Sequence, residues 1–231
     1  MTNEKEARRL SVAIDGPSGA GKSTLARAAA KELGLLYVDT GAIYRTVALH
    51  TLRRGAQPGD AAAAAALLPE LTITMAYDPE GLQRMYLNGE DVTDRIRTQE
   101  ISMAASAVST HPAVRAFLLD MQRDMAEKHD VIMDGRDIGT VVLPAAAVKI
   151  FLTASSETRA RRRWIELQQR GTPRDFEVLL QETRERDAND TQRAAAPLRP
   201  AEDAVILDTT ELDFRESLRR IIEIIRERTE Q

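Results

Sequence analysis

Residues 16–23 read Gly16-Pro17-Ser18-Gly19-Ala20-Gly21-Lys22-Ser23, and this stretch decides the fold. It fits the pattern G-x-x-x-x-G-K-[ST], in which glycines let the backbone curl until several N–H groups point at one anion. An apolar run at residues 10–14 precedes it, and a helix-like stretch from Thr24 to Leu33 follows it. Strand, glycine loop and helix in this order predict a phosphate-binding loop, because the helix adds its positive amino-terminal end to the cradle.

The phosphate-binding loop offers candidate ligands for a nucleoside triphosphate and for a metal ion. Lys22 can reach the β- and γ-phosphates of ATP and is a candidate catalytic residue. The hydroxyl of Ser23 can ligate Mg²⁺. The candidate ATP-binding residues are Gly16, Pro17, Ser18, Gly19, Ala20, Gly21, Lys22, Ser23 and Thr24.

Composition narrows the class of protein. The 231 residues suffice for one large domain or for a core with an insertion, and 43% hydrophobic with 29% charged residues is typical of a soluble globular chain. The absence of cysteine excludes disulfides, thiolate zinc sites and cysteine nucleophiles, and favours the cytoplasm. A net charge of −4 argues against nucleic acid as a partner. No apolar run approaches the length of a membrane span, and the start Met1–Arg9 lacks the core of a signal peptide. We therefore expect a cytoplasmic protein without membrane partners, and we expect it to be a monomer.

Short apolar runs alternate with helical patterns along the chain. The strand candidates are Leu10–Asp15, Leu35–Val38, Val131–Asp134, Val148–Thr153 and Ala204–Leu207. Their near-continuous apolar character is typical of strands buried on both faces. Apolar residues at helical spacing occur in residues 114–125 and 218–225. The alternation predicts an α/β fold of three layers, in which helices cover both faces of a five-stranded parallel sheet.

One stretch interrupts this alternation. Residues 71–77 and 82–87, joined by the turn Asp78-Pro-Glu-Gly81, predict a β-hairpin. Asn88-Gly89 predicts a second turn before a short strand. We therefore expect a small antiparallel insertion within an α/β core. The expected divisions are a first core part (10–59), the antiparallel insertion (60–95), a second core part (96–154), a helical arginine-rich lid (155–190) and a final core strand and helix (191–231).

Two segments that follow predicted strands carry polar side chains suited to a ligand. In Asp39-Thr-Gly-Ala-Ile-Tyr-Arg45, Thr40 can cap a helix, Tyr44 offers a ring and a hydroxyl, and Arg45 can hold an anion. Ligands of open α/β sheets lie beyond the carboxyl ends of strands, so this segment predicts a second ligand site. An ordinary capped helix with a surface arginine would have the same pattern.

The second such segment is Val131-Ile-Met-Asp-Gly-Arg-Asp137. An apolar strand ending in Asp134 is similar to a Walker-B segment, whose carboxylate orients Mg²⁺ or its water. Arg136 and Asp137 follow at the same strand end. A plain Asp-Gly turn with solvated charges is the alternative interpretation.

Arginines gather in the helical region after the fourth strand. Those at its start are Arg159, Arg161, Arg162 and Arg163. A Gly/Pro turn at residues 169–174 divides the region, so two basic helices could close over a nucleotide as a lid, with Arg162 and Arg163 as candidate catalytic residues. The alternative is a solvated helix face paired with Glu157 and Glu166.

A further charged face follows in the next predicted helix. Arg186, Asp190 and Arg193 are spaced by four and three residues and share one side of that helix. A simple charge ladder would have this spacing too. The three histidines are isolated, and none has a metal-ligand partner at usable spacing.

Four segments in order resemble the bacterial cytidylate kinases. They are residues 14–23, 39–45, 134–140 and 149–155, and the resemblance runs from about Leu10 to the carboxyl-terminal helix. It implies transfer of the γ-phosphoryl group of ATP to CMP or dCMP with Mg²⁺, and it includes an insertion where the hairpin is predicted.

The resemblance also assigns roles to single residues. It places Thr40, Tyr44 and Arg45 in the monophosphate site, with Arg45 and Arg136 on the acceptor phosphate and Arg136 among the catalytic residues. It assigns Ser106, Arg115 and Asp137 to the cytosine. It further assigns Arg186 and Asp190 to the sugar and Arg193 to a phosphate. Ser106 and Arg115 are unremarkable by sequence alone.

Two alternative functions remain open at this point. One is a kinase for another small acceptor, such as UMP, AMP or shikimate. The other is a GTP-dependent switch or regulatory P-loop protein, which needs an Asn/Thr-Lys-x-Asp segment to recognise guanine. The only approach to that segment is Glu127-Lys-His-Asp130, which lacks the leading residue.

Overall fold

Five parallel strands form the central sheet of the computed structural model, which describes residues 9–230. They are β1 (Ser11–Asp15), β2 (Leu36–Asp39), β6 (Val131–Gly135), β7 (Val148–Thr153) and β8 (Val205–Asp208). Across the sheet their order is β2-β6-β1-β7-β8, and every neighbouring pair is parallel. All five expected strands are confirmed. Apart from Arg9, the polar segment at the start of the chain lies outside the described residues.

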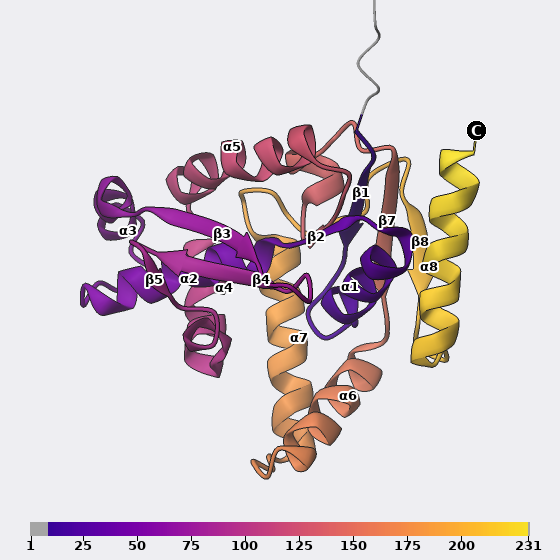
Figure 1. Cartoon of the computed structure of the whole chain (residues 1–231). Helices are drawn as coiled ribbons and strands as arrows, with labels where there is room; N and C mark the ends of the chain where they lie inside the picture. The colour runs from indigo at the N-terminus through magenta and orange to yellow at the C-terminus, as the bar shows by residue number, and fades with distance from the viewer. Residues whose placement is uncertain (1–8, 231) are drawn as a thin grey trace, which may run out of the picture.

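Helices cover both faces of the sheet, as Figure 1 shows. The covering helices are α1 (Lys22–Leu33), α5 (Pro112–Lys128) and α8 (Phe214–Thr229). Successive side chains of a strand point to opposite faces, so Val12 and Ile14 enter one core with α1 and α8, while Ala13 enters the other with α5. The three-layer α/β prediction is confirmed. Within residues 9–230, no helix has the length and apolar character needed to cross a bilayer.

A second region holds the predicted insertion and packs beside the sheet. Its elements are α2 (Thr40–Arg53), α3 (Ala61–Leu67), β3 (Ile73–Tyr77), β4 (Gln83–Leu87), β5 (Glu90–Asp91) and α4 (Gln99–Val108). The three strands are antiparallel in the order β3-β4-β5, so the hairpin prediction is confirmed. The alanine-rich α3 contributes Ala64 to a core shared with α2 and α4.

The hairpin is joined to the outer edge of the sheet through side chains. β2 lies at the end of the strand order, and its outer backbone groups have no neighbouring strand. The backbone N–H of Asp39 donates to Oε1 of Gln83 at 2.8 Å, and Nε2 of Gln83 donates to the carbonyl of Asp39 at 3.3 Å. The hydroxyl of Tyr77 donates to the carbonyl of Tyr37 at 3.0 Å. The insertion therefore covers this edge where β2 enters the ligand site.

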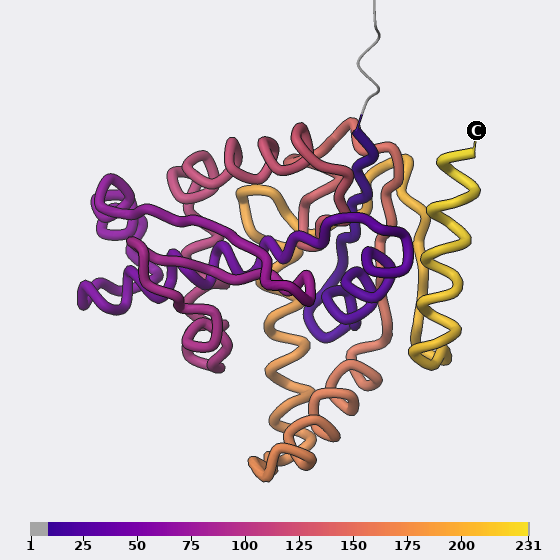
Figure 2. The backbone as a smooth tube through the Cα atoms, in the orientation of Figure 1, coloured from indigo at the N-terminus to yellow at the C-terminus, as the bar shows by residue number. Residues whose placement is uncertain are grey.

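Two helices extend away from the sheet as an arm, visible in the backbone trace of Figure 2. They are α6 (Ser156–Gln169) and α7 (Phe176–Gln192), joined by a turn in which Gly171 has a φ of 71°. Ser155 and Asp175 cap the two amino termini with their side-chain oxygens. The two helices and the turn between them lie where the sequence predicts them, but only α6 is basic, since α7 carries two arginines against five acidic residues.

Gly16 sets how closely the phosphate-binding loop approaches the sheet. Its φ is +150°, and a Cβ atom there would lie 1.9 Å from the carbonyl oxygen of Leu152 in β7. We expect Gly16→Ala to lower the free energy of unfolding by about 3 kcal/mol or more, through backbone strain and overlap with β7. Urea unfolding measures this change. Gly59→Ala is the matched control, since a Cβ there meets nothing within 4 Å; equal midpoints for the two variants would contradict the prediction.

Candidate active site

A single cavity of about 1240 Å³ brings the predicted site residues together at the carboxyl ends of the strands. Of those residues, its lining includes Ser18, Gly19, Ala20, Gly21, Lys22, Ser23, Thr24, Thr40, Tyr44, Arg45, Ser106, Arg115, Asp134, Arg136, Asp137, Arg162, Arg163, Arg186, Asp190 and Arg193. Gly16 and Pro17 are outside the lining. They form the base of the phosphate-binding loop, where Gly16 packs against β7 and Pro17 accepts a hydrogen bond from Lys22.

Lys22 lies buried where the loop becomes α1. Its Nζ donates to the carbonyl of Pro17 at 2.7 Å. Burial, together with the positive charge of Arg136, holds the pKa of Lys22 well below its usual value. An anion beside this amine would restore the charged form, so the environment of Lys22 fits a bound phosphate.

Asp134 and Ser23 meet beside the loop. The Ser23 hydroxyl donates to Oδ2 of Asp134 at 2.9 Å, and the Tyr37 hydroxyl donates to Oδ1 at 2.8 Å. Burial, reinforced by the negative charge of Asp39, raises the pKa of Asp134 to about 6. A hydroxyl and a buried carboxylate are hard oxygen donors of the kind Mg²⁺ prefers, so these residues fit that ion.

Asp39 rather than Thr40 caps α2. The Asp39 carboxylate accepts from the backbone N–H of Ala42 at 2.9 Å, because Asp39 keeps the extended backbone of β2 while Thr40 is already helical. The Thr40 hydroxyl is buried and donates to the backbone carbonyl of Asp134 at 2.7 Å. The proposed cap at Thr40 is therefore wrong, and its hydroxyl joins β6 to α2 instead.

Three guanidinium groups gather in the same cavity as the loop. Arg45 pairs with Asp39 at 2.7 Å, and Arg136 pairs with Asp190 at 2.8 Å. Burial and the nearby charge of Arg136 lower the pKa of Arg186 to about 10. The Nε atoms of Arg45 and Arg186 are buried and have no hydrogen-bond partner. Guanidinium groups that repel one another and have N–H donors without partners form a site that favours a phosphate group.

Asp137 lines the same cavity and lies among cations. Arg115 forms a close ion pair with one carboxylate oxygen, and Nη2 of Arg193 lies 3.5 Å from the other. Burial raises the pKa of Asp137, although both arginines oppose the shift. The guanidinium of Arg115 also lies 5.7 Å from the ring centre of Tyr44. Ser106 lines the same cavity. A carboxylate acceptor beside guanidinium donors can pair with the polar edge of a base.

The two arm arginines predicted to be catalytic contact protein groups. Arg162 donates to the carbonyl of Thr209 at 2.7 Å and to its Oγ1 at 3.3 Å. Arg163 pairs with Glu166 on the same helix at 2.8 Å. Both residues line the cavity wall. Their contact with a transferred phosphate stays a prediction.

Sequence reasoning missed the role of Asp15, the last residue of β1. Its two carboxylate oxygens each accept a backbone N–H, from Ile138 and from Gly139, both at 2.7 Å. Burial raises the pKa of Asp15 to about 6. These bonds join the strand that enters the phosphate-binding loop to the short π-helix Ile138–Val142 that follows Asp137. The available signal was an acidic residue ending an apolar strand directly before the glycine loop.

Comparison with known proteins gives a consistent result. The family model for cytidylate kinase matches residues 12–227. The cytidylate kinase of Caldicellulosiruptor bescii is 47% identical over 217 residues, covering 94% of this chain and 96% of that one. The enzyme of Pelotomaculum thermopropionicum is 50% identical, with 91% and 93% covered, and that of Mycobacterium leprae is 48% identical, with 94% and 96% covered.

Solved structures resemble the chain more distantly. A shikimate kinase from Acinetobacter baumannii in complex with shikimate aligns with a TM-score of 0.49 at 15% identity, covering 96% of each chain. A similarity this low carries no information about the acceptor. The family match and the curated relatives extend over nearly the whole sequence. The chain therefore belongs to the cytidylate kinase family.

Proposed function

We propose that this protein transfers the γ-phosphoryl group of ATP to CMP or dCMP, giving ADP and the corresponding diphosphate. The observation that carries the proposal is the single cavity, whose lining includes the phosphate-binding loop together with Arg45, Arg136 and Asp137. The two arginines are ion-paired with Asp39 and Asp190, which line the same cavity, so both guanidinium groups stay within the space that would hold the two nucleotides.

Charge neutralisation is the main task of such a site. Two polyanions must come together, and their phosphate oxygens gather charge as the transferred group passes between them. Lys22 would hold the donor phosphates, and Arg45 and Arg136 would hold the acceptor phosphate. The acceptor oxygen is already ionised, so no strong general base is needed. Closure of the arm, residues 155–190, with Arg162 and Arg163, would exclude water that would otherwise hydrolyse ATP.

Ser23 and Asp134 are the residues that would hold Mg²⁺. The ion supplies positive charge to the phosphates of ATP when bound. Asp134 is fixed for this role by the hydroxyls of Tyr37 and Ser23, which orient both carboxylate oxygens. Thr40 holds the backbone of Asp134 from the other side.

Recognition of the base is assigned to the end of the cavity around Asp137. Its carboxylate would accept from the exocyclic amine of cytosine, while Arg115 and Ser106 would donate to the ring acceptors. Uracil has a carbonyl in place of that amine and would face Asp137 acceptor to acceptor. Tyr44, stacked near Arg115, would border the base.

Contacts with the sugar are assigned to α7, and a further phosphate contact is assigned to the residue that directly follows this helix. Arg186 and Asp190 would meet the ribose or deoxyribose, and Arg136 lies beside both. Arg193 contacts Asp137 in this structure, so its proposed role as a phosphate ligand requires it to turn from that carboxylate. The cysteine-free, net acidic composition supports a cytoplasmic location and argues against nucleic acid as a partner. The protein would act as a monomer whose partners are ATP, CMP and dCMP rather than membranes.

Initial rates with ATP and Mg²⁺ against a panel of acceptors test the proposal. We expect kcat/KM for CMP and dCMP to exceed that for UMP and AMP by about a hundredfold or more, because the wrong base leaves buried polar groups unpaired. Shikimate should accept no phosphate. Equal rates with UMP, AMP or shikimate would overturn the assignment of the acceptor. Tight GTP binding without transfer to any acceptor would instead favour a regulatory P-loop protein.

A further inference from the structure

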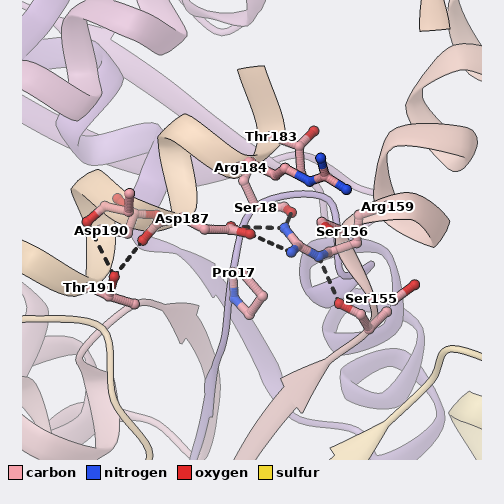
Figure 3. A network of polar contacts seen from close by, with 12 residues as sticks. Pro17, Ser18, Ser155, Ser156, Arg159, Thr183, Arg184, Asp187, Asp190 and Thr191 are labelled. Carbon is pink, nitrogen blue, oxygen red and sulfur yellow. Dashed lines mark hydrogen bonds and ion pairs between the residues drawn. The ribbon is translucent and has the colours of Figure 1, made fainter. Parts of the chain in front are cut away.

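Arg159 differs from the other arginines at the start of α6, because it is almost fully buried. Its residue exposure is 5%, and its guanidinium lies against the base of the phosphate-binding loop. Nε donates to the carbonyl of Ala154 at 2.9 Å, and Nη1 donates to the carbonyl of Ser18 at 3.0 Å. Nη1 and Nη2 also donate to the two carboxylate oxygens of Asp187, at 2.9 and 2.5 Å. Figure 3 shows the guanidinium of Arg159 next to both Ser18 and Asp187.

These contacts join three elements that are distant in sequence. Ser18 belongs to the phosphate-binding loop, Ala154 follows β7, and Asp187 belongs to α7. The base of the Arg159 side chain also packs on the loop, since a Cβ added at Gly19 would lie 3.3 Å from the Cβ of Arg159. The guanidinium therefore holds the position of the loop relative to α7.

The same part of α7 carries residues that face the proposed acceptor. Arg186 directly precedes Asp187, and Asp190 lies one turn later, where it pairs with Arg136. The hydroxyl of Thr191 donates to the carbonyl of Asp187 at 2.7 Å, which holds this turn together (Figure 3). A displacement of Asp187 would thus move the groups assigned to the acceptor sugar.

The chemistry of Arg159 suits a link rather than a contact with substrate. Four hydrogen bonds to protein acceptors occupy most of its five N–H groups. The two parallel bonds to Asp187 fix both distance and angle, because the guanidinium and the carboxylate are planar. A lysine would keep the charge but could not bond the loop, β7 and α7 in one fixed geometry.

We propose that Arg159 is a positioning residue that couples the ATP-binding loop to α7, so that donor and acceptor nucleotides strengthen each other's binding. The coupling is reciprocal: ATP orders the loop, the loop holds Arg159, and Arg159 holds the turn of α7 that meets the acceptor. The proposal rests on the proposed function, with CMP as the acceptor bound near Arg186 and Asp190.

The test measures CMP affinity by calorimetry, with and without a non-hydrolysable ATP analogue and Mg²⁺. In the natural protein we expect the analogue to tighten CMP binding about fivefold or more, a typical coupling between two sites. In Arg159→Lys we expect this factor to fall toward one, with CMP affinity in the absence of the analogue within about twofold of normal. We expect kcat to fall more than KM changes, since the two nucleotides bind without correct alignment.

Asp187→Asn is the second variant, because it keeps the shape of the side chain and one oxygen acceptor. It should also lower the coupling factor. The coupling factor of the double variant should be no lower than that of the more affected single variant, since both changes break the same link. Thermal unfolding identifies which variants are folded. If Arg159→Lys does not fold, Asp187→Asn alone decides the question.

Arg184→Ala is the matched control. Arg184 pairs with Glu157 at 2.6 Å and joins the same two helices, but both side chains are more than half exposed. It should leave the coupling factor unchanged. A normal coupling factor in a folded Arg159→Lys or Asp187→Asn protein, an equal loss in Arg184→Ala, or no coupling in the natural protein would each overturn the inference. If the natural protein does not phosphorylate CMP at all, the proposed function fails instead.

Discussion

Lys22→Ala is expected to lower kcat for CMP phosphorylation by about a hundred- to a thousandfold while the protein stays folded. Lys22 is 5% exposed at the amino end of α1, and burial, together with the positive charge of Arg136, lowers the pKa of its amine. Phosphates bound by the loop would favour the charged amine, and its attraction to them would increase as their oxygens gather charge. A coupled assay for ADP formation measures kcat, and thermal unfolding measures the fold.

Removal of Lys22 leaves the carbonyl of Pro17 without its donor, so we expect a loss of about 1–3 kcal/mol in the free energy of unfolding. A loss of this size leaves the protein folded at assay temperature. Lys31→Ala is the control, since Lys31 lies exposed in the last turn of the same helix. It should keep normal kcat. Near-normal turnover in Lys22→Ala would refute the placement of ATP in this loop.

The second large effect is expected for Asp137→Ala, which should raise KM for CMP about a hundredfold or more and change KM for ATP far less. The substitution removes the acceptor for the cytosine amine and leaves Arg115 and Arg193 with no carboxylate between them. Losing a hydrogen bond to a charged group and leaving the buried cytosine amine unpaired together cost about 3 kcal/mol of binding free energy, which is about a hundredfold in affinity. Initial rates at saturating concentrations of the other substrate give both KM values.

Asp137→Asn refines this test. An amide can donate to the uracil carbonyl, so this variant should lose CMP affinity and narrow the preference for CMP over UMP. Asp124→Asn provides the control, because Asp124 pairs with Lys128 on the exposed side of α5, the helix that also carries Arg115. It should behave as the natural protein. Equal changes in KM for ATP and CMP would show that Asp137 does not recognise the base.

The elements that the sequence predicts well are those determined by nearby residues. The phosphate-binding loop depends on glycines and a lysine within eight positions, and Gly16 and Gly21 adopt the positive φ values that such a loop needs. The hairpin follows from the turn at residues 78–81, where Gly81 has a φ of 76°. The buried strands follow from short unbroken apolar runs, which a sheet covered on both faces buries completely.

Long-range pairings account for what the sequence alone does not predict. Asp187 lies 28 positions from Arg159, and both resemble ordinary charges on helix faces. Which arginine meets phosphate and which joins helices depends on burial, and burial depends on the whole fold. The helix cap was misassigned for a local reason: Asp39 and Thr40 are both good capping residues, and only the last residue of β2 retains an extended backbone.

The contacts of Gln83 and Tyr77 with the backbone of β2 also bear on aggregation of the protein. A bare outer strand is a template for another chain, because its unpaired N–H and C=O groups can extend into an intermolecular sheet and lead to aggregation. Here amide and phenol groups of the insertion occupy the outer backbone groups at Tyr37 and Asp39. Shortening the insertion to make a minimal kinase would expose these backbone groups of β2, so we expect such a variant to aggregate more readily.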